Sequence, residues 1–194
     1  MPNPASITGS VRTSAARVPE VRLPSRTITL RTGHNTLTRL ATVGDHDAVN
    51  DLHARCSTAS RCTRYQSPRQ CLSPAEWRYL THIPNGLSWV THAQDNPHTV
   101  IAVANLMLTG NHRTAELGLL VEDRWQSRGL GTALARHAVE AVPLLGCRAV
   151  TVTTGADNIR MLRILTRLGT TPPSPTGPVV DVTISPRGAD RPCS

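Results

Sequence analysis

The sequence contains no phenylalanine and no lysine: all 21 of its basic residues are arginine. With Phe absent, a hydrophobic core has to rest on Leu, Val, Ile and Ala. The formal net charge is +8, so an anionic partner such as a polyphosphate ligand is expected. Aromatic residues make up only 3 % of the chain. A surface that binds single-stranded nucleic acid needs aromatic side chains among its arginines, because the bases stack on them, and this chain has too few. We therefore do not expect nucleic acid as a partner.

Long apolar segments are also missing. No apolar run approaches the ~20 residues that cross a bilayer. The N-terminal region carries Arg12, Arg17 and Arg22 but lacks the apolar stretch of a secretory signal. These absences predict a cytoplasmic protein with no membrane partner.

Paired metal-ligand spacings are absent as well. Cys56, Cys62 and Cys71 cluster near His53, but their spacings do not match the C-x₂₋₄-C pairs of structural zinc sites. The total of five cysteines is odd, which favours free thiols. We therefore predict reduced cysteines and no bound metal.

The 194 residues suffice for one domain with tails. Residues 1–25 are rich in Pro, Ser, Thr and Arg without periodicity, which predicts a flexible N-terminal arm. Residues 26–185 form the predicted domain, and residues 186–194 a C-terminal tail. No internal repeat is present.

Periodicity and turn residues predict the elements of this domain. Strands are expected at 26–31, 86–92, 99–108, 115–121, 148–153 and 179–184. Helices are expected from Asp45, over 73–81, over 129–142 and over 158–168, with Asp45 and Ser73 as N-caps and Glu76 completing a capping box. A short strand could precede the proline-rich loop at 172–178. The order β-α-α-β-β-β-α-β-α-(β)-β predicts a mixed α/β sheet with flanking helices, whose three consecutive strands form an antiparallel meander.

The segment 126–132 carries the most specific signal. It follows a hydrophobic strand and opens an amphipathic helix, and its residues are Gln126, Ser127, Arg128, Gly129, Leu130, Gly131 and Thr132. Glycines let an anion approach the backbone, and the first N–H groups of a helix have no internal acceptor. The helix dipole and Arg128 add positive charge at the same end. This pattern predicts a phosphate cradle, although an ordinary strand-to-helix turn would look similar.

The pattern Gln126-x-x-Gly129-x-Gly131 resembles the R/Q-x-x-G-x-G/A motif of the GCN5-related N-acetyltransferase (GNAT) family. The resemblance covers residues 26–185 and is strongest over 115–169. It implies a mostly antiparallel GNAT sheet and transfer of an acetyl group from acetyl-CoA to a primary amine. It also implies that 126–132 holds the pyrophosphate, that the strand edge at Leu119, Leu120 and Val121 binds the pantetheine arm, and that Asn158 contacts the cofactor.

The same resemblance points to Glu116 as a general base. In the histone-acetylating branch an Ala-Glu pair lies on the strand before the cofactor loop, and Ala115-Glu116 falls within one residue of that place. An ammonium acceptor must lose a proton before it attacks a thioester. Side-chain alternation puts Glu116 opposite Leu117 and Leu119, and partial burial there would suit a base that works near neutral pH. The alternative is a solvated or salt-bridged strand carboxylate.

One position departs from the family. Many GNAT enzymes have a Tyr that protonates the departing thiolate, and Leu165 occupies that place here. A coenzyme A thiolate is a tolerable leaving group, so transfer does not require the Tyr. The departure nevertheless keeps open an alternative function, a non-catalytic acyl-CoA-binding regulatory module of GNAT fold.

The acceptor stays open between a protein lysine and a small-molecule amine. Residues 53–81 loosely resemble the GNAT domain of actinobacterial protein-lysine acetyltransferases, which favours a protein acceptor. An acceptor site lined by carboxylates would suit a polycationic amine, and the helical region offers Asp45, Asp47, Asp51 and Glu76, although solvated helix faces explain them too. The sequence also leaves open whether the protein is a monomer or a homodimer.

Overall fold

The computed structural model describes residues 23–110, 113–171 and 177–185. The predicted arm at 1–25 lies outside these ranges except for its last three residues, and the tail at 186–194 lies wholly outside them. Within the described residues, no helix is both long and apolar enough to cross a membrane.

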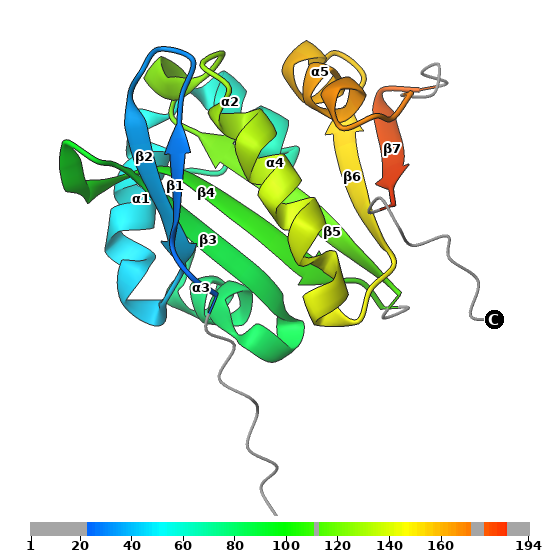
Figure 1. The fold of residues 1–194 in the computed structure, drawn as a ribbon, viewed down its shortest axis with the longest axis horizontal. Helices are drawn as coiled ribbons and strands as arrows, with labels where there is room; N and C mark the ends of the chain where they lie inside the picture. Colours follow the sequence, from blue (N-terminus) through cyan, green and yellow to red (C-terminus); the bar gives the residue numbers. More distant parts are fainter. Residues whose placement is uncertain (1–22, 111–112, 172–176, 186–194) are drawn as a thin grey trace, which may run out of the picture.

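Seven strands form a single sheet in chain order (Figure 1). They are β1 (Arg26–Thr29), β2 (Asn35–Leu40), β3 (Gly86–Ala93), β4 (Asn96–Leu108), β5 (Thr114–Val121), β6 (Ala149–Gly155) and β7 (Val179–Ile184). Every neighbouring pair is antiparallel except β5 and β6, which are parallel. The predicted mixed, mostly antiparallel α/β sheet is confirmed, and so is the meander, which is β3-β4-β5.

Helices cover both faces of the sheet (Figure 1). On one face lies α4 (Leu130–Ala141), whose residues Leu130, Leu134 and Ala138 are buried. The other face carries α1 (His46–Arg55), α2 (Thr58–Tyr65) and α3 (Pro74–Thr81). The fifth helix, α5 (Ile159–Arg167), contacts α4 beside β6. The core therefore has two layers, one on each side of the strands.

All three tryptophans contribute to these layers, which the sequence analysis did not predict. Trp77 is fully buried, and Trp89 and Trp125 are at least nine-tenths buried. Trp77 also donates from Nε1 to the carbonyl of Thr42. Three large indole rings thus fill core volume that phenylalanine would occupy in other proteins.

The helix start at Ser73 forms as predicted. Ser73 Oγ accepts from the Glu76 N–H at 3.2 Å, and Glu76 Oε2 accepts from the Ser73 N–H at 2.8 Å. Asp45 occupies the N-cap position of α1 as predicted, but its carboxylate makes no capping bond to that helix. A 3₁₀ turn, η1 (Val43–Asp45), comes first, and the Asp45 carboxylate accepts from Arg39 and Thr42 instead.

Two elements were not predicted. In β2 the inward-facing residues are Thr36 and Thr38, so the strand is buried without an apolar alternation. The short helix α2 has no apolar stripe, because most of its residues are polar. The remaining differences are boundaries, such as β4 beginning at Asn96. The optional strand before the proline-rich loop is not present in residues 168–171, and 172–176 lie outside the described residues.

Candidate functional site

The parallel strands β5 and β6 separate after a short paired stretch. Their register has three pairs and ends at Glu116 and Thr151. Beyond that point the two strands diverge (Figure 1). A cavity of about 670 Å³ opens there, lined by α2, β5, the loop before α4, the end of β6, and α5.

The free edge of β5 offers main-chain groups to this cavity in alternation. The Glu122 N–H donates to the Ile101 carbonyl of β4 at 2.9 Å, which fixes the alternation along the strand. Leu120, paired with Val103, therefore points its main-chain groups at β4, whereas those of Leu119 and Val121 point into the opening. Leu120 also lines the cavity but without free main-chain groups, which narrows the predicted edge to Leu119 and Val121.

The loop before α4 ends in a strained turn that aims backbone N–H groups outward. Gly129 has φ +98° and Ser127 has φ +59°, both in the left-handed region. The first main-chain bond of the helix joins the Ala133 N–H to the Gly129 carbonyl at 3.1 Å. The N–H groups of residues 130–132 therefore have no acceptor within the helix, and this end of α4 favours an anion.

Only some of the predicted loop residues line the cavity. Those that line it are Gln126, Ser127, Gly129, Gly131 and Thr132. Leu130 does not, because it is fully buried in the core. Nor does Arg128, whose guanidinium carbon lies 5.4 Å from the centre of the Trp125 ring. Arg31 instead lines the cavity at this place and donates from Nη2 to the Ser127 carbonyl at 2.7 Å.

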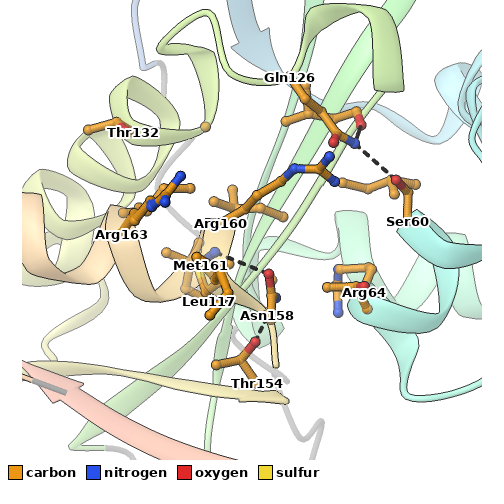
Figure 2. Close-up of a pocket in the computed structure, with 18 of the residues that line it drawn as sticks. Ser60, Arg64, Leu117, Gln126, Thr132, Thr154, Asn158, Arg160, Met161 and Arg163 are labelled. Carbon is orange, nitrogen blue, oxygen red and sulfur yellow. Dashed lines mark hydrogen bonds between the residues drawn. The ribbon is translucent and has the colours of Figure 1, made fainter. Parts of the chain in front are cut away.

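Gln126 holds the loop in place. Its Nε2 donates to Ser60 Oγ at 3.0 Å and to the Val121 carbonyl at 2.8 Å. Figure 2 shows the first of these bonds crossing from the loop to α2. The Gln of the motif thus joins three walls of the cavity, and its amide nitrogen is occupied within the protein.

Positive charge predominates in the cavity. Five arginines line it, against the two carboxylates of Glu116 and Asp157; they are Arg31, Arg64, Arg160, Arg163 and Arg167. The last three share one face of α5 because they are spaced i, i+3 and i+7. Figure 2 shows Arg160 extending towards Gln126, and Arg163 lying near Thr132 of α4. This cluster was not predicted, although its helical spacing after Asn158 is visible in the sequence.

Asn158 caps α5 from the cavity wall. Its Oδ1 accepts from the Met161 N–H at 3.1 Å, and its Nδ2 donates to Thr154 Oγ1 at 2.7 Å (Figure 2). The side chain therefore binds protein groups at both ends of its amide. It orients the first turn of α5, whose next residues carry the arginines.

Glu116 lies at the narrow end of the cavity, on the last residue pair that joins β5 to β6. The predicted sidedness is confirmed, since Leu117 and Leu119 are buried in the α4 layer and Leu120 in the opposite one. The expected partial burial is wrong, because the Glu116 side chain is exposed.

A general acid would have to protonate the departing thiolate, and neither position 165 nor Tyr65 offers a free hydroxyl for this. Leu165 is fully buried in the α4 layer. Tyr65 lines the cavity, but its hydroxyl lies 2.6 Å from Nε2 of buried His53. His53 Nδ1 must donate to the Val49 carbonyl, and burial lowers the pKa of His53, so Nε2 is the acceptor and Tyr65 the donor. Burial also raises the pKa of Tyr65, which keeps its proton on this bond.

The carboxylates suggested for an acceptor site do not reach the cavity. Asp47 and Asp51 are exposed on α1, and Asp45 binds Arg39. Glu76 pairs with Arg69 and completes the cap of α3. None of the four lines the cavity.

The four described cysteines are free thiols: Cys56, Cys62, Cys71 and Cys147. Burial raises the pKa of Cys56 to about 12. Across the part of the chain that the structure describes, no group of three metal-binding side chains comes together.

Known proteins share this architecture. A family model, the acetyltransferase (GNAT) family, matches residues 47–170. No curated protein sequence matches the chain. Among solved structures, the GNAT domain of S. lividans PAT has a TM-score of 0.74 at 22 % identity, covering 83 % of this chain and 96 % of that one.

Two further solved structures share the fold. A putative acetyltransferase from Salmonella typhimurium, solved with its cofactor acetyl-CoA, has a TM-score of 0.63 at 14 % identity and covers 82 % of this chain and 98 % of its own. A spermidine N-acetyltransferase from Vibrio cholerae, in complex with CoA and spermine, has a TM-score of 0.62 at 14 % identity, with coverages of 79 % and 97 %.

Proposed function

The chain belongs to the GNAT family of acetyltransferases, and on this premise we propose that it transfers the acetyl group of acetyl-CoA to a primary amine. The observation that carries the proposal is the split between β5 and β6, which puts a free strand edge beside the N-terminus of α4. A ligand with an amide-bearing arm and a pyrophosphate matches both features. We also propose that residues 26–185 make up the acetyltransferase domain.

The residues present fit coenzyme A in charge and in hydrogen bonding. The N–H groups of Gly131 and Thr132 would hold the pyrophosphate, as the open end of α4 favours an anion. Arg31 and the α5 arginines Arg160 and Arg163 would neutralise phosphate charge. The main-chain groups of Leu119 and the N–H of Val121, whose carbonyl already accepts from Gln126, would bind the amides of the pantetheine arm in the manner of an added strand.

Bound acetyl-CoA supplies an activated thioester, and this chain would contribute position and proton transfer. In the proposal Glu116 takes the proton that the acceptor ammonium must lose, either directly or through a water molecule. Its place on β5, at the narrow end of the cavity, supports this role. Its exposure gives water access to the carboxylate.

One observation favours the alternative of a non-catalytic acyl-CoA-binding module. Leu165 stands where a Tyr acid occurs in many GNAT enzymes, and the side chain is fully buried. A thiolate leaves without protonation at modest cost, so this substitution alone does not require a loss of activity. The two functions differ in turnover and agree in cofactor binding.

A titration and a transfer assay test the proposal together. Acetyl-CoA is titrated calorimetrically into the purified protein, and release of free CoA is then followed with a panel of small amines, peptides and tRNA. We expect binding, and release of CoA that depends on an amine. Binding without turnover on any acceptor would favour the regulatory module, and absence of binding would overturn both functions.

A further inference from the structure

An arginine on α2 lies against β5 at a glycine. The guanidinium of Arg64 occupies the space where a side chain at position 118 would begin, since a Cβ built on Gly118 would lie 2.2 Å from Arg64 Cζ. Both residues line the cavity, and Figure 2 shows Arg64 on the α2 side of it. Glycine at position 118 is therefore what admits the arginine to the strand surface.

Two contacts hold the Arg64 guanidinium: its Cζ lies 4.8 Å from the centre of the Tyr65 ring, and one of its nitrogens has a protein acceptor. Its Nη2 donates to Asn105 Oδ1 at 3.1 Å, and Asn105 in turn donates from Nδ2 to Ser88 Oγ at 2.9 Å. No described residue accepts a hydrogen bond from Nη1 or from the buried Nε. The guanidinium is thus fixed in place by a buried polar chain while most of its donors stay unused.

The charge of Arg64 has no ion-pair partner among the described residues. By contrast, Arg69 nearby on the chain pairs with Glu76. The charge of Glu116 acts on Arg64, but among the described residues no salt bridge joins the two. Burial lowers the pKa of Arg64, yet a guanidinium stays protonated at neutral pH. A partly buried cation of this kind is stabilised by an anion, and none of the residues that the structure describes puts one in contact with it.

Arg64 and the phosphate cradle lie on opposite faces of β5. Position 118 shares its face with Glu116 and Leu120, and Leu120 is buried in the α1 and α3 layer. The N-terminus of α4 belongs to the other layer, with Leu117 and Leu119. A phosphate of coenzyme A held at α4 therefore does not account for the unused donors of Arg64. They face the side from which an acceptor would approach Glu116.

We propose that Arg64 binds a carboxylate of the acceptor, so that the preferred acceptor is a small zwitterion of the amino-acid type, with its amine at Glu116. This inference rests on the proposed function and specifies its substrate class. Positions 116 and 118 are two residues apart on one face, about 7 Å along the strand, a span that a small molecule with both charges can bridge. The positive charge of Arg64 would bind the carboxylate of such a molecule, and the negative charge of Glu116 would bind its ammonium group.

The same arrangement disfavours polycations. A second ammonium group near the partly buried guanidinium would be repelled, which selects against polyamines and basic peptides. The guanidinium also lowers the pKa of a neighbouring acceptor ammonium, which raises the fraction of free amine that can attack. Arg64 would therefore contribute both to specificity and to deprotonation.

Matched acceptors test this proposal. Values of kcat/KM are measured for an α-amino acid, for its carboxamide, which lacks only the negative charge, and for spermidine. In the wild type we expect kcat/KM for the amino acid to be at least ~10-fold higher than kcat/KM for spermidine. The variant Arg64→Met should raise KM for the amino acid by ~10- to 100-fold and leave KM for the carboxamide within about twofold.

A second variant removes the contact without removing the arginine. Gly118→Ala puts a methyl group where the guanidinium lies, so it should also raise KM for the amino acid selectively. The affinity for acetyl-CoA should stay unchanged in both variants, because the main chain of Gly118 faces β4. Better use of spermidine than of the amino acid by the wild type, or an equal loss on amino acid and carboxamide in both variants, would refute the proposal while leaving the acetyltransferase function intact. A protein that binds no acetyl-CoA would instead refute the function itself.

Discussion

The amide nitrogen of Gln126 lies 3.0 Å from Oγ of Ser60, and this bond fastens the loop before α4 to the helix α2. Ser60 passes the connection on, donating from Oγ to Asp123 at 2.8 Å, and Asp123 also accepts from Ser57 at the start of α2. The loop proposed to hold the cofactor and the helix proposed to recognise the acceptor thus share one hydrogen-bond network. Changes at one wall of the cavity should be felt at the other.

We expect Ser60→Ala to lower the affinity for acetyl-CoA several-fold, because it frees the Gln126 side chain to move. A double-mutant cycle with Gln126→Ala should give a coupling free energy of unfolding of about 1 kcal/mol. Thr166→Ala is the control, since Thr166 donates only to the Leu162 carbonyl of its own helix and does not line the cavity. Strictly additive effects of the two substitutions would show that the bond is unimportant in solution.

Gly129→Ala should weaken acetyl-CoA binding by at least ~10-fold, because alanine disfavours the left-handed φ of +98° that aims the loop, by ~1–2 kcal/mol. Gly146→Ala is the control: its φ is +68° and it does not line the cavity. Both variants should lose a similar amount of stability, and only the first should lose affinity in calorimetry. A folded Gly129→Ala protein with unchanged affinity would contradict the assigned cradle.

Glu116→Gln should reduce turnover at neutral pH by ~10²–10⁴-fold, as removal of a general base typically does. Cofactor affinity should stay unchanged, and turnover should recover partly at high pH as the free amine fraction of the acceptor grows. Glu140→Gln serves as the control, because Glu140 pairs with Arg26 on the outside of α4. Wild-type turnover of Glu116→Gln near pH 7 would rule the carboxylate out as the base.

Stability should fall in acid partly through Asp45. Burial alone would raise the pKa of Asp45, but the hydrogen bonds from Arg39 and Thr42 outweigh it and lower the pKa from 3.8 to about 2. A carboxyl whose folded pKa is depressed contributes stability above its unfolded pKa, near 3.8, and loses it as the pH falls through about 2. The contribution is up to about 2 kcal/mol. Denaturation of wild type and Asp45→Asn at pH 6, 4 and 2 should show the difference between them shrinking; a constant difference would contradict the assignment.

The cysteines should differ in reactivity. Cys71 is exposed, whereas Cys56 is buried and burial raises its pKa to about 12, so little thiolate forms there. Alkylation of the native protein at pH 8, followed by peptide mass mapping, should modify Cys71 first and leave Cys56 intact until the protein unfolds. Equal labelling of the two would indicate that α1 opens readily.

Much of this protein follows from short-range sequence signals. The capping box from Ser73 to Glu76 and the meander of β3, β4 and β5 depend on neighbouring residues and on alternation, so they were predictable. The Gly129 turn at the start of α4 was predictable for the same reason, because a left-handed residue before a helix is a local requirement. These signals were enough to identify the family.

Other features depend on partners distant in the chain. The strand β2 is buried through threonines whose hydroxyls find partners elsewhere, as Thr38 Oγ1 does 2.9 Å from Thr91 Oγ1, so no apolar pattern marks it. The motif itself does not indicate that Arg128 packs on Trp125 while Arg31 takes the place beside Ser127.

By itself, then, the sequence determined the family, the order of most elements and the place of the anion-binding turn, because each is encoded within a few consecutive residues. Only the tertiary structure decided which side chains share the cavity. The separation of β5 from β6 exposes Glu116, and the packing of α2 brings Arg64 onto Gly118, 54 positions along the chain. Contacts of that separation are set by how the layers pack, and no local pattern in the sequence records them.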